Sequence, residues 1–291
     1  MAYSIRPNND FVLLNAQNEN PNQLDIQLFT DFVQNPGGVS VGIPMDGGAF
    51  NFTTVSTNLT RSSADHTDYG PTSGHGFSSW TMTAVTGLVD MKSSLLIPGI
   101  RTPATNEVTK YEMEVGFKTK SAVWSAGDIY GLSRFGFMGT GSVTPTDGVY
   151  IEQFVNGTFD DLQGFWVDST PLDTNWHVVF RKDSNTERYD TGVKVSKETI
   201  YQMYLSVERD SAGNFATNFK IRNVSSGVTT FGFFTPSSTS FYPSASTDYL
   251  FPAFVVNGIG DGELYGGLVP KYIVDYVGAR VRYPIKREIL I

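Results

Sequence analysis

The chain contains no cysteine and only three histidines, and each shortage excludes a kind of site. Without cysteine there can be no disulfide and no thiolate-bound zinc, so the fold does not depend on redox state. The histidines His66, His75 and His177 are too few and too scattered to predict a histidine metal cluster.

Positive charge and long apolar runs are also scarce. There are 21 Lys and Arg residues against 29 Asp and Glu, which gives a formal net charge of −8. A chain with this balance lacks the basic surface of a nucleic-acid binder, so we expect no such partner. No apolar run approaches the length of a membrane helix, which predicts no membrane span. The first residues, MAYSIRPNNDFVLL, lack the basic and apolar regions of a secretory signal, and we expect synthesis in the cytoplasm.

Aromatic and small residues are abundant. The 291 residues include 21 Phe, 14 Tyr and 29 Gly, and 40% of the chain is hydrophobic. This length is sufficient to bury a large core. Phe and Tyr combined with Gly, Ser and Thr favour strands joined by turns.

The composition changes near residue 105. Between positions 36 and 87 only four residues carry a formal charge, and Gly, Ser and Thr dominate. We therefore predict that residues 1–105 form an N-terminal docking or extension region with irregular structure and short strands. Whether it is a separate domain or an extended arm stays open. Residues 106–291 are predicted to form the main folded body, with a short C-terminal tail.

The C-terminal part shows the two-residue alternation of strands. The segment at 200–224 predicts a hairpin, because Met203, Leu205 and Val207 share one face and Asp-Ser-Ala-Gly at 210–213 supplies a turn. In the segment NWHVVFRKDSNTERYDTGV at 175–193, alternation places Trp176 in the core and His177 on the opposite face. Many short strands without an amphipathic helix predict an antiparallel two-sheet β-sandwich.

An ordered set of short motifs carries a family resemblance over about residues 106–284. The motifs are DGVYI at 147–151, NW at 175–176, DTGV at 190–193, YQMYLSV at 201–207, FKI at 219–221 and VDYV at 274–277. In this order they resemble the concanavalin A-like jelly-roll domain found in structural proteins of tailed-phage virions.

The resemblance implies a non-enzymatic virion protein, either a capsid decoration (cement) protein or a tail or fibre component on the virion surface. Its expected partners are major capsid or tail proteins and further copies of itself, contacted through the N-terminal region. Two alternatives stay open because the fold does not fix function. One is a lectin-like receptor-binding module that binds a surface glycan on its concave face, and the other is a polysaccharide-cleaving glycosidase.

One segment matches the spacing of the calcium motif of legume lectins, which share this fold, with Glu in place of the motif's first Asp. The residues at the matching offsets are Glu152, Phe154, Asn156 and Asp161. They would supply carboxylate, carbonyl and amide oxygens, the ligands that calcium prefers. A strand that ends in an Asn-Gly turn explains the same residues without metal.

Candidate sugar-binding and catalytic residues are few. Tyr150, Trp166 and Tyr189 offer rings that can stack on sugars, and His177 would join them if its face is the concave one. Core packing is the alternative for each of them. Glu112 and Glu114 lack the third acid of the laminarinase-like pattern, so we predict no catalytic residue.

Overall fold

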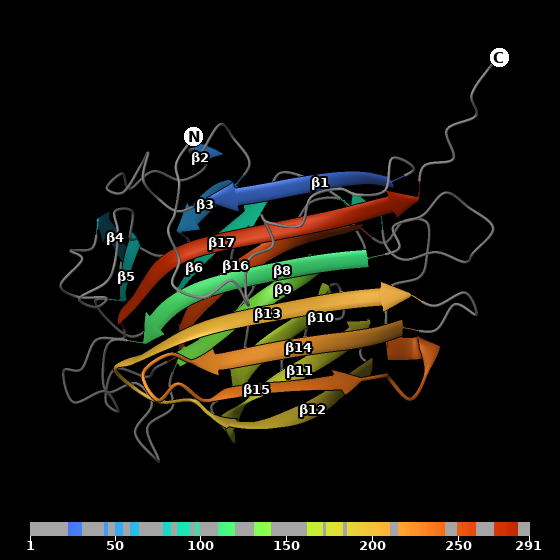
Figure 1. The fold of residues 1–291 in the computed structure, drawn as a ribbon. Coiled ribbons are helices and arrows are strands. Elements are labelled where there is room, and N and C mark those ends of the chain that lie inside the picture. Colours follow the sequence, from blue (N-terminus) through green and yellow to red (C-terminus); the bar gives the residue numbers. More distant parts are fainter. Residues whose placement is uncertain are drawn as a thin grey trace.

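The protein is seen in a computed structural model that describes its strands and several connections (Figure 1). The described residues are 23–30, 44–45, 50–54, 59–63, 78–82, 86–93, 97–98, 110–119, 131–140, 162–170, 173–182, 185–209, 215–241, 249–259 and 271–284. Within them the structure is almost entirely strand, apart from one 3₁₀ turn at Thr239–Phe241. None of the described segments is a helix long and apolar enough to cross a membrane.

The described strands form two sheets, and every pairing in them is antiparallel. Sheet A has eight strands, with the order β15-β14-β13-β8-β17-β5-β4 and with β1 also paired to β17. Their bounds are β1 Gln23–Thr30, β4 Leu59–Ser63, β5 Ser78–Met82, β8 Lys110–Thr119, β13 Thr199–Arg209, β14 Phe215–Asn223, β15 Thr229–Phe234 and β17 Lys271–Pro284.

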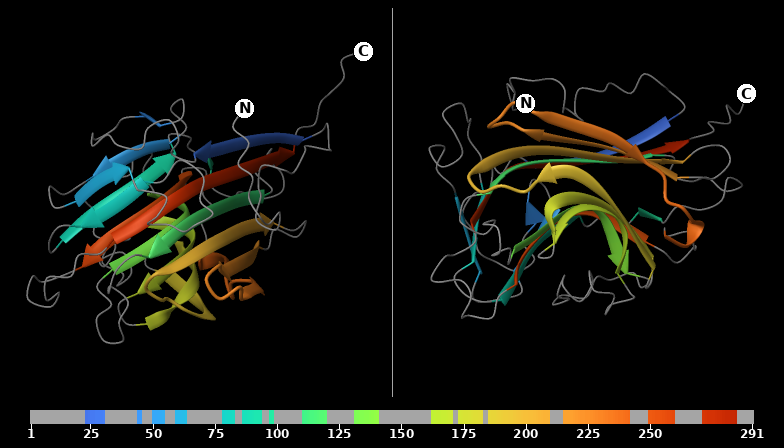
Figure 2. Two further views of the ribbon diagram at one scale, coloured as in Figure 1. Left: turned by 60° about the vertical axis from the view of Figure 1, so that its left-hand side comes forward. Right: turned by 90° about the horizontal axis from the view of Figure 1, so that it is seen from below.

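Sheet B has nine strands, with the order β12-β11-β10-β9-β16-β6-β3-β2 and with β7 also paired to β16. Their bounds are β2 Pro44–Met45, β3 Phe50–Thr54, β6 Thr86–Ser93, β7 Ile97–Pro98, β9 Gly131–Thr140, β10 Leu162–Thr170, β11 Asp173–Lys182, β12 Asn185–Lys194 and β16 Tyr249–Ile259. The second view in Figure 2 shows strands β9–β12 arching, with the hollow side turned away from sheet A.

The core lies between the two sheets and is built by alternate residues of facing strands. The ring of Trp176 on β11 meets Phe117 on β8 and Tyr201 on β13 edge to face, with centroid distances of 5.8 and 5.7 Å. Such tilted aromatic contacts are favourable beyond the area they bury. This packing joins sheet B to sheet A at the centre of the molecule.

The prediction of an all-β, antiparallel two-sheet sandwich is confirmed. The predicted hairpin is β13–β14, in which Met203 pairs with Ile221 and Leu205 with Phe219. The segment at 175–193 belongs to β11 and β12, which pair with each other and place Lys182 opposite Asn185.

Described strands also occur in the predicted N-terminal region. Five of them have two to five residues, which agrees with the expectation of short strands. Strands β1 and β6 have eight residues each and pair with β17 and β16 of the C-terminal part. The domain division at residue 105 stays a prediction.

Candidate functional site

The alternation along β11 shows which of its residues lie on the outer face of sheet B. Trp176, Val178 and Phe180 belong to the core cluster. Because successive side chains of a strand point to opposite faces, His177 and Arg181 lie on the outer, hollow side of the sheet. Both are polar residues, yet both are largely buried, with exposed fractions of 6% and 1%.

Strand register lines up four charged or titratable positions across this face. Arg134 on β9 pairs with Asp168 on β10, Asp168 pairs with His177 on β11, and His177 pairs with Asp190 on β12. Neighbouring strands are about 4.8 Å apart, so this polar row spans about 14 Å. Arg134 is buried whereas Asp190 is exposed, so solvent reaches the row from the β12 end.

A second row runs beside the polar row and contains Trp166. Its position on β10 pairs with Gly136 on β9 and with Val179 on β11. On the far side of Gly136 lies Ala253 of β16, and on the far side of Val179 lies Arg188 of β12. The tryptophan position is thus bordered by a glycine and a short aliphatic residue.

A hydrogen-bonded clip fixes the exposed end of the polar row. The side-chain amide of Asn175 donates to both oxygens of the Asp190 carboxylate at 3.1 Å, and the Gly192 backbone N–H donates to Oδ1 at 2.7 Å. The Thr191 hydroxyl donates to the Trp176 carbonyl at 2.6 Å. Gly192 has φ of 70°, a left-handed conformation that favours glycine. The NW and DTGV motifs therefore meet in space and build one irregularity between β11 and β12.

This clip also favours the ionised form of Asp190. The hydrogen bond from the Gly192 backbone lowers the pKa of the Asp190 carboxyl below its usual 3.8, and Asn175 and His177 lower it further. An anion held by hydrogen bonds is a good acceptor but a poor proton donor at neutral pH. The exposed end of the row is suited to accepting hydrogen bonds rather than to acid catalysis.

The other predicted site residues do not all lie at this face. The Tyr189 ring packs on Phe219 and Phe234, at 5.7 and 5.1 Å, and so lies at the rim of the core between the two sheets with 38% of its surface exposed. Tyr150 and the four calcium candidates Glu152, Phe154, Asn156 and Asp161 fall outside the described residues. Sugar binding and calcium binding by these residues stay predictions. Within the segments that the structure describes, no group of three or more His, Cys, Asp or Glu side chains is placed to hold a metal ion.

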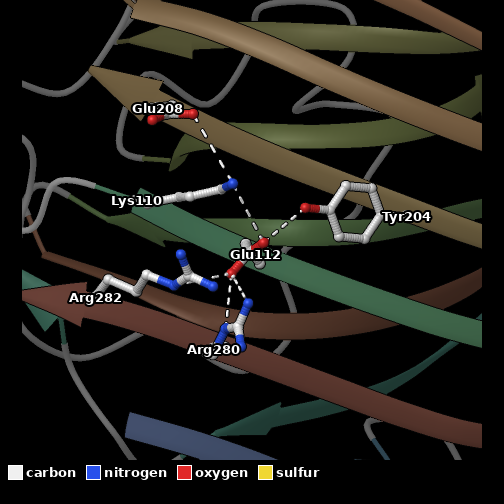
Figure 3. Close-up of polar contacts among 6 residues, drawn as sticks. All are labelled: Lys110, Glu112, Tyr204, Glu208, Arg280 and Arg282. Carbon is white, nitrogen blue, oxygen red and sulfur yellow. Dashed lines mark hydrogen bonds and ion pairs between the residues drawn. The ribbon is translucent and has the colours of Figure 1, made fainter. Parts of the chain in front are cut away.

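A second charged cluster lies on the opposite side of the molecule, on the outer face of sheet A (Figure 3). The Arg280 guanidinium of β17 contacts Glu112 Oε2 of β8 through Nε and through a terminal nitrogen, both at 2.7 Å. The Tyr204 hydroxyl donates to Oε1 at 2.7 Å, and Lys110 and Arg282 approach the same carboxylate at 3.4 and 3.5 Å. Glu112 and Arg280 are almost completely buried.

The two acids that most resembled a catalytic pair in the sequence thus belong to the sheet opposite the hollow one. Burial by itself would raise the pKa of Glu112, but Lys110, the Tyr204 hydrogen bond and Arg280 together hold that pKa below 4.5. Glu114 accepts a short hydrogen bond from the Tyr276 hydroxyl. Sequence spacing did not reveal the Arg280–Glu112 contact, because 168 residues separate the two partners.

Comparison with known proteins finds likeness in structure alone. No protein-family model matches the chain, and no curated protein matches it in sequence. Among solved structures, the basic winged bean lectin with Tn-antigen has a TM-score of 0.56 at 7% identity, covering 90% of this chain and 100% of the lectin. Lectin UEA-II complexed with galactose has a TM-score of 0.52 at 11% identity, covering 88% and 98%.

A third similar structure is arcelin-5, a lectin-like defence protein from Phaseolus vulgaris, with a TM-score of 0.52 at 10% identity over 89% of this chain and 99% of arcelin-5. By their names these neighbours are two lectins and a lectin-like protein. At sequence identities this low, the likeness shows a shared fold and not a shared activity. The chain has the concanavalin A-like jelly-roll fold of the legume lectins, arranged as two antiparallel sheets.

Proposed function

We propose that this protein is a non-enzymatic carbohydrate-binding protein and that its glycan surface is the outer face of strands β9–β12. The observation that carries the proposal is the polar row from Arg134 to Asp190 on the hollow side of sheet B. Sugar hydroxyls both donate and accept hydrogen bonds, and the exposed β12 residues Arg188 and Asp190 offer a donor and an acceptor at the solvent-facing end of this face.

The accessible end of the row is the preferred place for the ligand. Asp190 and Arg188 of β12 are exposed, and the Asn175–Asp190 hydrogen bonds hold the carboxylate in one orientation before a ligand arrives. A pre-ordered acceptor lowers the entropy cost of binding. The Trp166 position lies one row further along, paired with Gly136 and Val179, and adds an aromatic residue to the proposed surface.

The arrangement also supports binding without hydrolysis. A retaining glycosidase places its two carboxyl groups about 5–5.5 Å apart. The Asp168 and Asp190 positions are separated by two strand spacings, about 9.6 Å, with His177 between them. This spacing does not fit the retaining arrangement but is close to the upper limit of about 9.5 Å for inverting enzymes, so it is the pKa of Asp190 that disfavours hydrolysis. The lowered pKa of Asp190 is the opposite of what a general acid requires.

The test is a glycan array probed with the full chain, followed by titration of the bound glycans. We expect Trp166→Ala and Arg188→Gln each to weaken binding by about tenfold. The matched control is Lys194→Gln, an exposed residue of the same strand β12, which should leave the affinity unchanged. Absence of any bound glycan, or equal affinity in all three variants, refutes the proposed surface. Turnover of a labelled glycan refutes the non-enzymatic assignment.

A second candidate function is that of a tailed-phage virion protein on the capsid or tail surface, bound to other virion proteins and to copies of itself. This candidate rests on the sequence resemblance, two of whose motifs, NW at 175–176 and DTGV at 190–193, contact one another. The two candidates are compatible, since a receptor-binding virion protein would have both properties.

Mass spectrometry and antibody labelling of purified particles test the virion candidate. Many copies per particle are expected, and absence from particles that carry all other structural proteins contradicts it. The full chain is the right material for attachment experiments. Deleting residues 1–105 would remove β1 and β6, which pair with β17 and β16, and would therefore damage both sheets.

A further inference from the structure

Two large aromatic side chains are exposed on edge strand β15 of sheet A. Phe231 has 78% and Phe233 has 61% of its surface exposed, and Val228 next to the strand has 60%. A contiguous exposed apolar patch often marks a binding site, and these neighbouring rings form one. This patch lies on the sheet opposite the proposed glycan surface.

The core fixes the direction of both rings. Gly232 between them faces inward, where an added Cβ would lie 2.5 Å from the Phe219 ring, so this position has no room for a side chain. Phe234 packs on Phe180 and Tyr189 at 5.3 and 5.1 Å. Because the strand is anchored by these contacts, the rings stand on the outer face about 6.7 Å apart along β15.

The cross-strand neighbours of the rings on β14 are polar or basic. Phe233 pairs with Asn218 and Phe231 pairs with Lys220, and Arg222 follows on the same face opposite Thr229. Lys220 and Arg222 are the only formally charged residues between positions 211 and 247, in a chain whose net charge is −8.

The size and the charge of the patch limit what can bind there. A phenylalanine buries roughly 200 Å² when covered, so the two rings expose about 280 Å² together. A stable protein interface needs about 800 Å² from each partner. A symmetric contact with a second copy would also bring Lys220 and Arg222 close to their own equivalents, which is unfavourable.

We propose that the outer face of β14–β15 is a second binding surface, which takes an acidic polysaccharide carrying uronate or sulfate groups. The two rings stack on the apolar faces of successive sugars, and Lys220 and Arg222 pair with the anionic groups. Two cations suit a ligand with separated anionic groups, whereas nucleic-acid binders commonly neutralise six or more phosphates. The surface is independent of the polar row on sheet B, because the core lies between them.

Affinity electrophoresis and calorimetry with polygalacturonate test this surface, and dextran of similar length serves as the neutral polymer. The full chain is expected to bind polygalacturonate in a salt-dependent manner and not to bind dextran at this site. Phe231→Ser with Phe233→Ser should reduce the affinity by about tenfold or more, and Lys220→Gln with Arg222→Gln by a similar factor.

The matched charge control is Lys194→Gln with Lys197→Gln, which removes two exposed cations elsewhere and should leave binding unchanged. Trp166→Ala should also leave it unchanged, which separates this surface from the proposed function. The inference is overturned if polygalacturonate does not bind, or if the control lowers affinity as much as the β14–β15 variants. Tighter binding of single-stranded DNA, or self-association that depends on Phe231 and Phe233 without polysaccharide binding, also overturns it.

Discussion

Replacing Arg280 by methionine should destabilise the sandwich, because it leaves Glu112 charged and buried without its closest partner. Arg280 supplies two contacts of 2.7 Å to the same carboxylate oxygen, and both residues are at least 96% buried. Removing one partner of a buried pair costs about 3–5 kcal/mol. Lys110 and Arg282 remain at 3.4 and 3.5 Å and compensate in part, so we expect a loss of about 3 kcal/mol.

Thermal and urea unfolding at pH 7 measure this loss. A chain of this size shifts its midpoint by about 2 °C for each kcal/mol, which predicts a decrease of about 6 °C. The matched variant replaces both partners, Glu112→Leu with Arg280→Met, and should be more stable than Arg280→Met because no buried charge is left unpaired. A loss below about 1 kcal/mol in the single variant, or equal instability of the double variant, would refute the reasoning.

The same cluster predicts a pH dependence with a defined sign. The folded-state pKa of Glu112 is below 4.5, so its contribution to stability is complete above 4.5 and is lost as the pH falls through the folded-state value. The free energy of unfolding in urea is measured between pH 7 and pH 3 for the native chain and for the Glu112→Gln variant. The stability difference between them should shrink below pH 4.5, and a difference that grows on acidification contradicts the assignment.

Three further substitutions have expected outcomes. Gly164 has φ of 150° and no room for a Cβ, which would lie 1.9 Å from a backbone carbonyl of β9, so Gly164→Ala should cost more than about 3 kcal/mol in urea unfolding. Thr191→Val removes the hydroxyl that donates to the Trp176 carbonyl and should cost about 1–2 kcal/mol in the same assay; no change would show that the clip does not stabilise the fold. Phe231→Ser with Phe233→Ser should leave the thermal midpoint within about 2 °C of the native value, since both rings are exposed, and a larger decrease would assign them a structural role.

Much of the strand pattern and many of the buried faces follow from local sequence. Side chains of a strand alternate with a period of two, so Met203, Leu205 and Val207 could be assigned to one face, and all three are buried in the core. The same rule separated Trp176 from His177. These assignments depend on neighbouring residues only, which is why the sequence was sufficient for them.

The composition of the rows across each sheet could not be derived in this way. The row from Arg134 to Asp190 exists because three strand pairings have one particular register, and a shift of one residue would send each side chain to the other face. The orientation of β15 is a similar case, because the run TTFGFF has no clear alternation. The close packing of Phe219 over Gly232 decides that Phe231 and Phe233 face outward.

The sequence by itself therefore determined the all-β class, the sandwich and the inward faces of its best-patterned strands, because hydrophobic alternation and turn residues act over a few positions. Only the tertiary structure decided which polar residues meet. Glu112 and Arg280 are brought into contact by the β8–β17 pairing, and Asp190 is joined to Asn175 by a bulge between β11 and β12. The physical reason is that register is a property of two strands together, and neither strand specifies it alone.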